Sequence, residues 1–411
     1  MIKKISQCRI CKNTQLTQIL DLGTQMLTGV FPTEKNTQTV TSGPLRLVKC
    51  CGEKACGLVQ LEHSYDLAEM YGLNYGYRSG LNKSMVDHLH GKIAKILQAI
   101  ELKSGDLVID IGSNDSTSLQ AYPKNVATLV GIDPTGIKFH QYYPEHIDLI
   151  PDFFSADLVT KKYPGRKAKV ITSFSMFYDL EDPMAFMQEI AQVLADDGIW
   201  VFEQSYMPTM LKTNSFDTVC HEHLEFYALK QIQFMVERAG LHIVDVELNE
   251  TNGGSFSITV RKKQAGDQLE PAVKAILDQE TAMGLDTLEP FTAFSQRIEI
   301  VKKQLLAFIK DCKVRGKKVA ALGASTKGNV LLQYCGLSAN DIFCVGEVNS
   351  EKFNCFTPGS WIPIIPESEL ISLKPDYLIV LPWHFRSYFI HNPKFKGMQL
   401  VFPLPELEIV S

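Results

Sequence analysis

The stretch LVIDIGSNDST (107–117) decides the fold of this chain. It opens with a short apolar run that is typical of a buried strand and that ends on Asp110. Gly112 then lets the backbone turn sharply into a helix, so a nucleoside can lie against the main chain at the carboxyl end of the sheet. The next apolar run, TLVGIDP (128–134), ends on Asp133, 23 residues after Asp110. A carboxylate at this position can accept hydrogen bonds from ribose hydroxyls.

Two other nucleotide-binding patterns do not match this loop. It is not the G-x-G-x-x-G of dinucleotide binders, and it lacks the Lys and Ser/Thr of a Walker motif. A nucleoside is therefore expected rather than a triphosphate. Residues 105–134 agree with the first strand–loop–helix–strand of a class I methyltransferase that binds S-adenosylmethionine. On these residues alone, a turn in another kind of α/β domain stays an alternative.

The rest of the chain supplies two α/β series. An amphipathic helix is expected at 81–101, and apolar runs separated by helix-length segments follow at 170–178 and 198–205, which favours a parallel, doubly wound sheet. Two alternating strands flank an Asn-Gly-Gly turn within 242–263, an antiparallel hairpin pattern. After a helical stretch at 264–315, a second α/β series has strands within segments 317–325, 342–349 and 376–383.

A chain of 411 residues exceeds what one hydrophobic core usually supports. We expect three units, and the fold class is α/β. Residues 1–65 form a cysteine-bearing module, residues 66–263 a central α/β domain and residues 264–411 a C-terminal α/β domain.

Composition excludes several function classes. The net charge is −5 and no basic stripe is present, so nucleic acid is not an expected partner. No run approaches 18 apolar residues, and the N-terminus has no signal-peptide pattern, so neither membrane association nor export is expected and the location predicted is cytoplasmic. A monomer or a small homo-oligomer is expected.

Five of the ten cysteines fall within the first 56 residues. Cys8-x-x-Cys11 is typical of a metal knuckle, and a second pair lies in KCCGEKACG, where Cys56 has either Cys50 or Cys51 as its partner. Four thiolates satisfy tetrahedral Zn²⁺ and could fold a module too small to be stable alone. Such a closed site would be structural. Unrelated buried cysteines are the alternative.

Candidate proton-transfer groups lie in DTVCHEHLEFYAL (217–229). The segment holds His221 and His223 with neighbouring acids, but it is not the H-E-x-x-H of zinc proteases. A carboxylate beside a histidine can orient the ring and raise its basicity. Because the two histidines point in different directions in any regular structure, we expect one of them to face a cleft. Hydrogen-bonded histidines in a helix-start loop are the alternative.

Two further polar segments are candidates for the acceptor site. YGLNYGYRSGLNKSM (71–85) brings Tyr75, Tyr77 and Arg78 together, either at a sugar or nucleotide site or on an interdomain surface. GASTKGNVLLQY (323–334) follows a strand and opens a helix. Its backbone N–H groups, with Lys327, could hold a phosphate or pyrophosphate.

Together these segments resemble the C-methyltransferases that act on nucleotide-linked deoxyketosugars. The resemblance runs almost from end to end, through motifs that keep their order: CRIC and CGLVQL, YRSGLNKSM, IGSND, SMFYDLEDP, EQSY, CHEHLEFYAL, NGGSF, GASTKGN and PWHF. It implies an N-terminal zinc module, a central S-adenosylmethionine domain and a C-terminal Rossmann-like domain that helps to bind a dTDP- or GDP-type sugar.

The resemblance also implies a reaction, methylation of C3 of a 4-keto-deoxyhexose through an enolate that a base generates. His223 is the expected base, Glu222 orients it or binds the sugar, and Tyr77 lies over the sugar and stabilises the oxyanion. The residues expected around S-adenosylmethionine are Asp110, Gly112, Asn114, Asp115, Asp133, Glu203 and Gln204. Those expected around the nucleotide-sugar are Tyr75, Arg78, His221, Asn252 and Lys327.

Two residues depart from the family pattern. Cys220 stands where a tyrosine often precedes the His-Glu-His, and Asp179 stands where some members have a histidine. Both put the identity and stereochemistry of the sugar in doubt and leave the reaction class standing. The alternative functions are methylation of a non-sugar acceptor and a non-catalytic, zinc-dependent scaffold.

Overall fold

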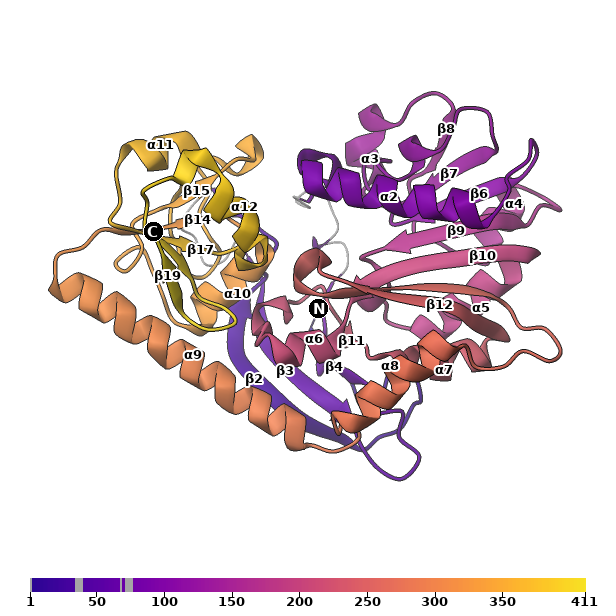
Figure 1. Ribbon diagram of the computed structural model, residues 1–411, viewed down its shortest axis with the longest axis horizontal. Helices are drawn as coiled ribbons and strands as arrows, with labels where there is room; N and C mark the ends of the chain where they lie inside the picture. Colours follow the sequence, from indigo (N-terminus) through magenta and orange to yellow (C-terminus); the bar gives the residue numbers. More distant parts are fainter. Residues whose placement is uncertain (1, 34–39, 67–68, 71–76) are drawn as a thin grey trace.

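Two α/β domains lie on either side of an N-terminal β-sheet in the computed structural model, which describes residues 2–33, 40–66, 69–70 and 77–411. Figure 1 shows strands β2 and β3 at the base between the two domains and the long helix α9 (Glu289–Val314) running along the outside of the C-terminal one. The predicted fold class, α/β with a cysteine-bearing module and a second α/β domain, is confirmed.

The N-terminal domain is built on a four-stranded antiparallel sheet with the order β11-β4-β3-β2. Its strands are β2 (Leu16–Met26), β3 (Ser42–Cys50), β4 (Val59–Leu61) and β11 (Glu225–Phe226), and a separate ladder joins β1 (Lys3–Lys4) to β5 (His63–Ser64). The sequence showed this region only as turn-rich, because two irregularities in the β2–β3 register interrupt the alternation of side chains. Strand β11 comes from the segment that follows His223.

The central domain contains a seven-stranded sheet with the order β12-β13-β10-β9-β6-β7-β8, in which β13 is antiparallel to both of its neighbours and all the other strands run in one direction. The strands are β6 (Leu107–Ile111), β7 (Thr128–Ile132), β8 (Ile147–Ile150), β9 (Ala168–Phe174), β10 (Leu194–Ser205), β12 (Leu241–Asn249) and β13 (Ser255–Lys262). The predicted hairpin is present, and Asn252 in its turn has a φ of 55°.

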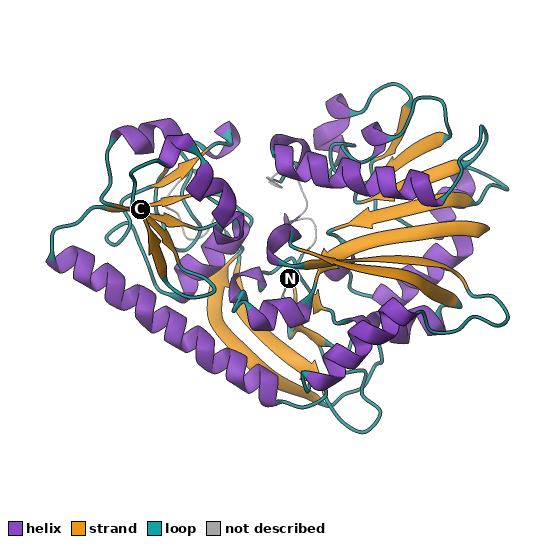
Figure 2. Ribbon diagram, viewed as in Figure 1, coloured by secondary structure: helices purple, strands orange, loops and turns teal. Residues whose placement is uncertain are grey.

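Helices cover both faces of this sheet, as Figure 2 shows. Successive residues of a strand point to opposite faces, so Val108 packs with Ile93 of α2 (Lys83–Ala99), whereas Ile109 joins the cluster under α5 (Pro183–Val193) and α7 (Leu229–Arg238). The helices of this domain are α2 (Lys83–Ala99), α3 (Gly136–Phe139), α4 (Ala156–Lys162), α5 (Pro183–Val193), α6 (Met207–Lys212) and α7 (Leu229–Arg238).

Helix α8 (Pro271–Ala282) begins beyond residue 263 but packs on the central domain, since Val273 and Ile276 belong to that core. Its Glu280 is buried, and Oε1 accepts hydrogen bonds from the Tyr206 hydroxyl at 2.7 Å and from the Leu229 N–H at 2.6 Å. This carboxylate caps the start of α7 and fixes the end of β10.

The C-terminal domain has a six-stranded sheet with the order β16-β15-β14-β17-β18-β19, parallel except for β19. This is the doubly wound order of a Rossmann-like domain. The strands are β14 (Val319–Leu322), β15 (Val345–Glu347), β16 (Ile364–Pro366), β17 (Tyr377–Val380), β18 (Leu400–Phe402) and β19 (Glu408–Val410), and the helices are α10 (Thr326–Tyr334), α11 (Glu367–Ser372) and α12 (Arg386–His391).

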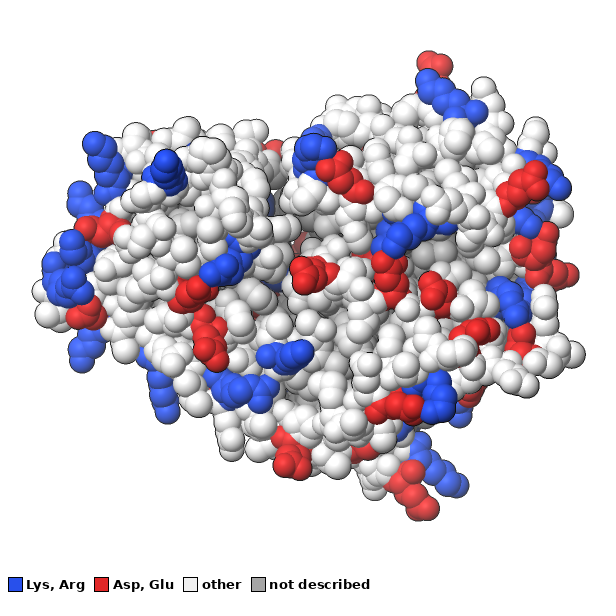
Figure 3. All heavy atoms as spheres, viewed as in Figure 1, with Lys and Arg blue, Asp and Glu red and all other residues white. Residues whose placement is uncertain are grey.

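The chain after β2 crosses from the N-terminal sheet to the C-terminal domain. The side chains of Gln333 and Asn329 in α10 bond to the backbone of Met26 and Thr28 at 2.7–3.2 Å. Figure 3 shows acidic and basic side chains interspersed on the face drawn and a hollow between the two larger domains. Among the described residues, no helix is long and apolar enough to cross a membrane.

Candidate active site and metal centre

Four N-terminal cysteines form one cluster. The Sγ atoms of Cys8, Cys11, Cys50 and Cys56 all lie within 4.8 Å of one another. Cys8 Sγ is 3.5 Å from Cys56 Sγ, and Cys11 Sγ is 3.4 Å from Cys50 Sγ. Four thiolates at this spacing fit a tetrahedral Zn²⁺ ion, and a set of four protein ligands makes a closed, structural site.

The structure distinguishes the two adjacent cysteines that the sequence left as alternatives. Cys50 ends β3 and is buried in the cluster, whereas Cys51 is partly exposed and lies outside it. Asn13 supports this arrangement from its side-chain amide, which donates to Cys50 Sγ at 3.2 Å and to the Cys51 carbonyl at 2.7 Å. An N–H donor to a metal-bound sulfur orients the ligand.

The Gly-rich loop after β6 crosses the carboxyl edge of the central sheet. Three of its residues have positive φ, namely Gly112 at 72°, Asn114 at 50° and Ser116 at 62°. A Cβ on residue 112 would lie 3.0 Å from Met176 Cγ. Glycine is therefore required there both for the conformation and for space.

Asp133 follows β7 and holds this loop in place. Its Oδ2 accepts a hydrogen bond from the Asn114 N–H at 2.7 Å, and its Oδ1 accepts from the N–H and hydroxyl of Thr135 at 2.7 and 2.6 Å. A carboxylate offers roughly four acceptor positions, so one remains for a ribose hydroxyl. The strand-end acid and the glycine loop fit a nucleoside at this edge.

Asp110 lies beneath the loop and is buried within β6. The Thr172 hydroxyl donates to its Oδ1 at 2.5 Å. Burial raises the pKa of Asp110 to about 7, and the hydrogen bond from Thr172 opposes this shift. Near neutral pH the carboxyl group can therefore donate as well as accept a hydrogen bond.

Glu203 and Gln204 end β10 with their side chains on opposite faces of the sheet. Glu203 accepts from Asn249 at 2.7 Å and pairs with Lys92 at 3.0 Å and His88 at 2.5 Å, so it fastens α2 and β12 to the sheet. Burial raises the pKa of Glu203, but His88 and Lys92 outweigh it and the pKa is lowered. The buried amide of Gln204 has no hydrogen-bond partner among the described residues.

The side chains of Asn114 and Asp115 bind the segment that precedes α2. Asn114 Oδ1 accepts from the Ser79 N–H at 3.0 Å, and Asp115 Oδ2 accepts from the Gly80 N–H at 2.9 Å. Asp115 Oδ2 also lies 3.6 Å from Arg78 Nε. These two residues, expected at the cofactor, therefore couple the cofactor loop to residues 78–80.

Within that segment, Arg78 packs against the central domain, whereas Tyr77 is about half exposed. The Arg78 guanidinium stacks on the Tyr142 ring at 4.3 Å, which places it against the central domain. The Tyr77 side chain is 49% exposed, and its carbonyl accepts from the Asn114 amide at 3.2 Å. Tyr75, the other tyrosine expected at the acceptor, lies outside the described residues.

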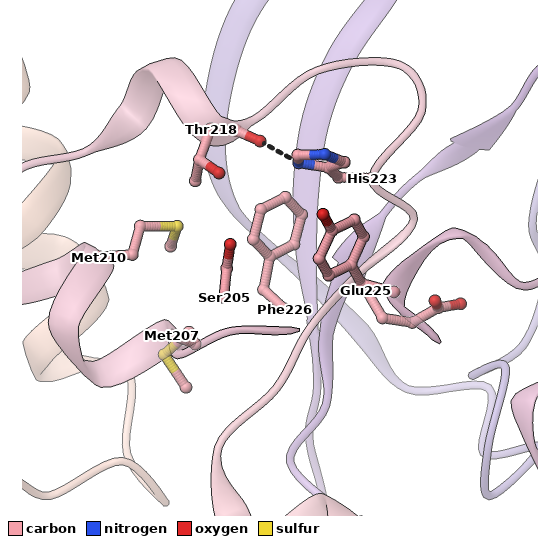
Figure 4. Close-up of a pocket in the computed structure, with 8 residues that line it drawn as sticks. Ser205, Met207, Met210, Thr218, His223, Glu225 and Phe226 are labelled. Atoms are coloured by element: carbon pink, nitrogen blue, oxygen red, sulfur yellow. Dashed lines mark hydrogen bonds between the residues drawn. The ribbon is translucent and has the colours of Figure 1, made fainter. Parts of the chain in front are cut away.

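His223 lines a narrow, largely apolar pocket (Figure 4). Its Nδ1 lies 2.8 Å from the Thr218 carbonyl oxygen, which can only accept, so Nδ1 carries the proton and Nε2 is the basic nitrogen. The rings of Tyr178 and His223 lie 4.3 Å apart. Burial and, to a smaller extent, the charge of Lys327 lower the pKa of His223 to about 4, while the hydrogen bond to the Thr218 carbonyl opposes the shift.

The neighbours of His223 in the sequence contact different parts of the molecule. His221 is fully buried edge-on against Tyr65 of the N-terminal domain at 4.6 Å, and burial lowers its pKa to about 4. Glu222 points toward Gly29, where a Cβ would collide with its Oε1. Burial raises the pKa of the Cys220 thiol well above its ordinary value, as do the charges of Glu222 and Asp179.

Groups from the C-terminal domain complete the site. Lys327, in the first turn of α10, donates to the Asn252 carbonyl at 2.6 Å. Trp383 Nε1 donates to the buried Asp217 at 2.8 Å, which joins the C-terminal domain to the start of the His223 segment. His384 lies beside Trp383, and its Nδ1 is buried without a hydrogen-bond partner among the described residues.

Sequence reasoning named neither Asp217 nor His384 as a site residue, and it also missed Glu347 at the end of β15. Glu347 Oε2 accepts from the Ala324 N–H at 2.8 Å, and Oε1 accepts from the Val348 and Asn349 N–H groups at 2.7 and 2.9 Å. This repeats the contact that Asp133 makes in the central domain. The sequence does contain a signal for Glu347, because in GEVN an acid ends the second strand of an α/β unit.

Exchanging Cys50 for serine should remove the bound zinc and lower the melting temperature, because three thiolates cannot close a tetrahedral site. Cys51→Ser is the matched control and should keep one zinc ion per chain. Metal content by atomic emission and thermal unfolding measure both effects. Zinc retained in Cys50→Ser and lost in Cys51→Ser would reverse the assignment.

Three family models match consecutive parts of this chain. They describe a zinc binding domain over residues 8–71, a methyltransferase domain over residues 85–246 and a C-methyltransferase C-terminal domain over residues 250–405. The C-methyltransferase NovU of Streptomyces niveus is 28% identical over 417 residues, covering 100% of this chain and 98% of the relative.

Among solved structures, an S-adenosylmethionine-dependent methyltransferase from Clostridium acetobutylicum matches with 11% identity and a TM-score of 0.35, over 44% of this chain and 92% of that one. A methyltransferase from Bacillus halodurans matches with 12% identity and a TM-score of 0.33, over 42% of this chain and 100% of that one. The three family models, in the order that the domains follow, describe the whole architecture. Along its whole length the chain is therefore similar to S-adenosylmethionine-dependent C-methyltransferases, with a zinc-binding domain, a methyltransferase domain and a C-methyltransferase C-terminal domain in that order.

Proposed function

We propose that this C-methyltransferase adds a methyl group to C3 of a nucleotide-linked 4-keto-deoxyhexose and produces a branched sugar. The observation that carries the proposal is the setting of His223, a neutral imidazole with one nitrogen fixed by Thr218. Such a group can remove the proton from a carbon next to a ketone. The segment that carries it touches the C-terminal domain through Asp217 and Trp383.

The reaction divides between the substrate and the protein. His223 Nε2 takes the proton from the carbon, and the electron pair left behind delocalises onto the neighbouring carbonyl oxygen as an enolate. S-adenosylmethionine, when bound, supplies a methyl group on a positively charged sulfur; that carbon–sulfur bond breaks as the new carbon–carbon bond forms. Residues 110–115 and Asp133 would hold the donor at the carboxyl edge of the central sheet.

The oxyanion needs a donor, and we assign this role to Tyr77. Its backbone is anchored to Asn114 in the cofactor loop, and about half of the residue is exposed beside that loop, where the ring would cover an acceptor. A phenol hydroxyl aimed at the carbonyl oxygen stabilises the enolate more than the ketone. In this arrangement the loop after β6 would support both the bound methyl donor and the Tyr77 ring that lies over the acceptor.

The nucleotide half of the acceptor is assigned to the C-terminal domain. Ser325 caps α10 by accepting from the Gly328 N–H at 3.0 Å, and Lys327 adds a positive charge in the same turn. A helix start of this kind favours a phosphate. Glu347 stands where Asp133 stands in the central domain, which supports a second ribose site.

Replacing His223 with alanine should reduce methyl transfer by about 100-fold or more, the range of general base catalysis, with S-adenosylmethionine affinity nearly unchanged. The assay offers a panel of dTDP- and GDP-linked 4-ketosugars with a labelled methyl donor and reads the product by mass spectrometry. His391→Ala removes an exposed histidine of α12 and should leave turnover as it is. Undiminished turnover in His223→Ala would remove the assigned base. Methylation of a non-sugar compound alone would favour another acceptor class.

The dependence of kcat/KM on pH provides a second test, because the charge of Lys327 lowers the pKa of His223. Because the pKa of His223 is about 4, the base stays neutral at pH 6 to 8 and kcat/KM should not fall on the acid side of this range. Lys327→Met removes a charge that lowers this pKa, so the acid limb should move to higher pH. Lys313→Met, at an exposed ion pair with Asp341, is the control. An unmoved limb, or a limb at lower pH, would contradict the assignment.

A further inference from the structure

Arg9 lies inside the metal knuckle, between the ligands Cys8 and Cys11, and its side chain is buried. The guanidinium turns away from the sulfur atoms. It donates to the Leu61 carbonyl at 2.7 Å and to the Ser64 hydroxyl at 2.9 Å, which ties the knuckle to β4 and β5. A guanidinium with several fixed partners has little freedom to move.

Two acids from later parts of the chain also approach Arg9, and its Nε lies 3.7 Å from Glu181 Oε2. Its Nε lies 3.5 Å from Glu225 Oε1, and the Glu225 side chain is fully buried. Among the described residues, Arg9 is the one basic side chain in an ion pair with Glu225, and Figure 4 shows Glu225 pointing away from the other labelled side chains of the pocket. Burial raises the pKa of Glu225 well above its ordinary value, as do the charges of Asp179 and Glu181, and Arg9 is the charged group that opposes this shift, so the contact favours one position of the strand.

Glu225 is two residues from His223, and the chain between them is held on both sides. The Leu61 N–H donates to the Leu224 carbonyl at 2.8 Å, and the Leu224 N–H donates to the Tyr178 carbonyl at 2.8 Å. Glu225 itself stands opposite Gln60 in the β11–β4 pair. On this side of His223, the N-terminal domain therefore defines where the backbone runs.

We propose that Arg9 is a positioning residue for His223, which it places through Glu225 so that the metal knuckle sets the location of the base. The inference rests on the proposed role of His223. It gives the zinc module a part in the reaction without contact to substrate. A misplacement of about 1 Å at a reacting group can cost about 100-fold in rate, so loss of the contact should lower kcat more than it raises KM.

Two variants test this from opposite sides of the contact. Arg9→Met removes the cation at similar volume, and Glu225→Gln keeps the shape of the strand residue and leaves the knuckle untouched. The measurements are zinc content, S-adenosylmethionine affinity, kcat and KM, and deuterium uptake by the acceptor in D₂O with S-adenosylhomocysteine bound. We expect both variants to keep zinc and donor affinity, and to lose about tenfold or more in kcat and in deuterium uptake.

Arg46→Met is the matched control, because Arg46 belongs to β3 and makes a partly exposed ion pair with Asp21 at 2.8 Å. It should behave as wild type. Wild-type kcat in both test variants would overturn the proposal, and so would a loss of activity that follows a loss of zinc in each. If the wild-type enzyme methylates its acceptor but takes up no deuterium, the base role of His223 fails and this inference with it.

Discussion

The segment from Asp217 to Phe226 is held by three domains at once, and the candidate active site depends on this constraint. Strand β11 completes the sheet of the N-terminal domain, the Leu224 N–H bonds to Tyr178 of the central domain, and Asp217 accepts from Trp383 of the C-terminal domain. The position of His223 is therefore a property of the assembled chain.

Features with a local cause could be predicted from the sequence. The conformation at Gly112 and the acid at Asp133 lie within one strand–loop–helix–strand unit, and the hairpin turn at Asn252 needs only neighbouring glycines. Strands β2 and β3 escaped prediction because register irregularities hide their alternation. Cys50 and Cys51 could not be separated either, since only the direction of the last residue of β3 decides which thiol reaches the cluster.

Contacts between distant segments had no local signal. Asp217 and Trp383 are 166 positions apart, and each is unremarkable within its own motif. Asn114 and Asp115 were expected at the cofactor, yet their side chains bind residues 79 and 80. The cofactor loop is thus also the anchor for the segment that carries Tyr77. One loop therefore supports both the strand-end acid Asp133 and the segment from Tyr77 to Gly80.

The space between the central and C-terminal domains gathers buried polar groups that the protein itself does not satisfy. Glu222 Oε2 and His384 Nδ1 have no hydrogen-bond partner among the described residues. Each such group costs roughly 1–3 kcal/mol of folding free energy, and groups of this kind persist where function requires them. An apolar acceptor would leave the cost in place, whereas a ligand with several hydroxyl and phosphate oxygens would remove it. The stability given up at this interface therefore favours a polar ligand over an apolar one between the two domains.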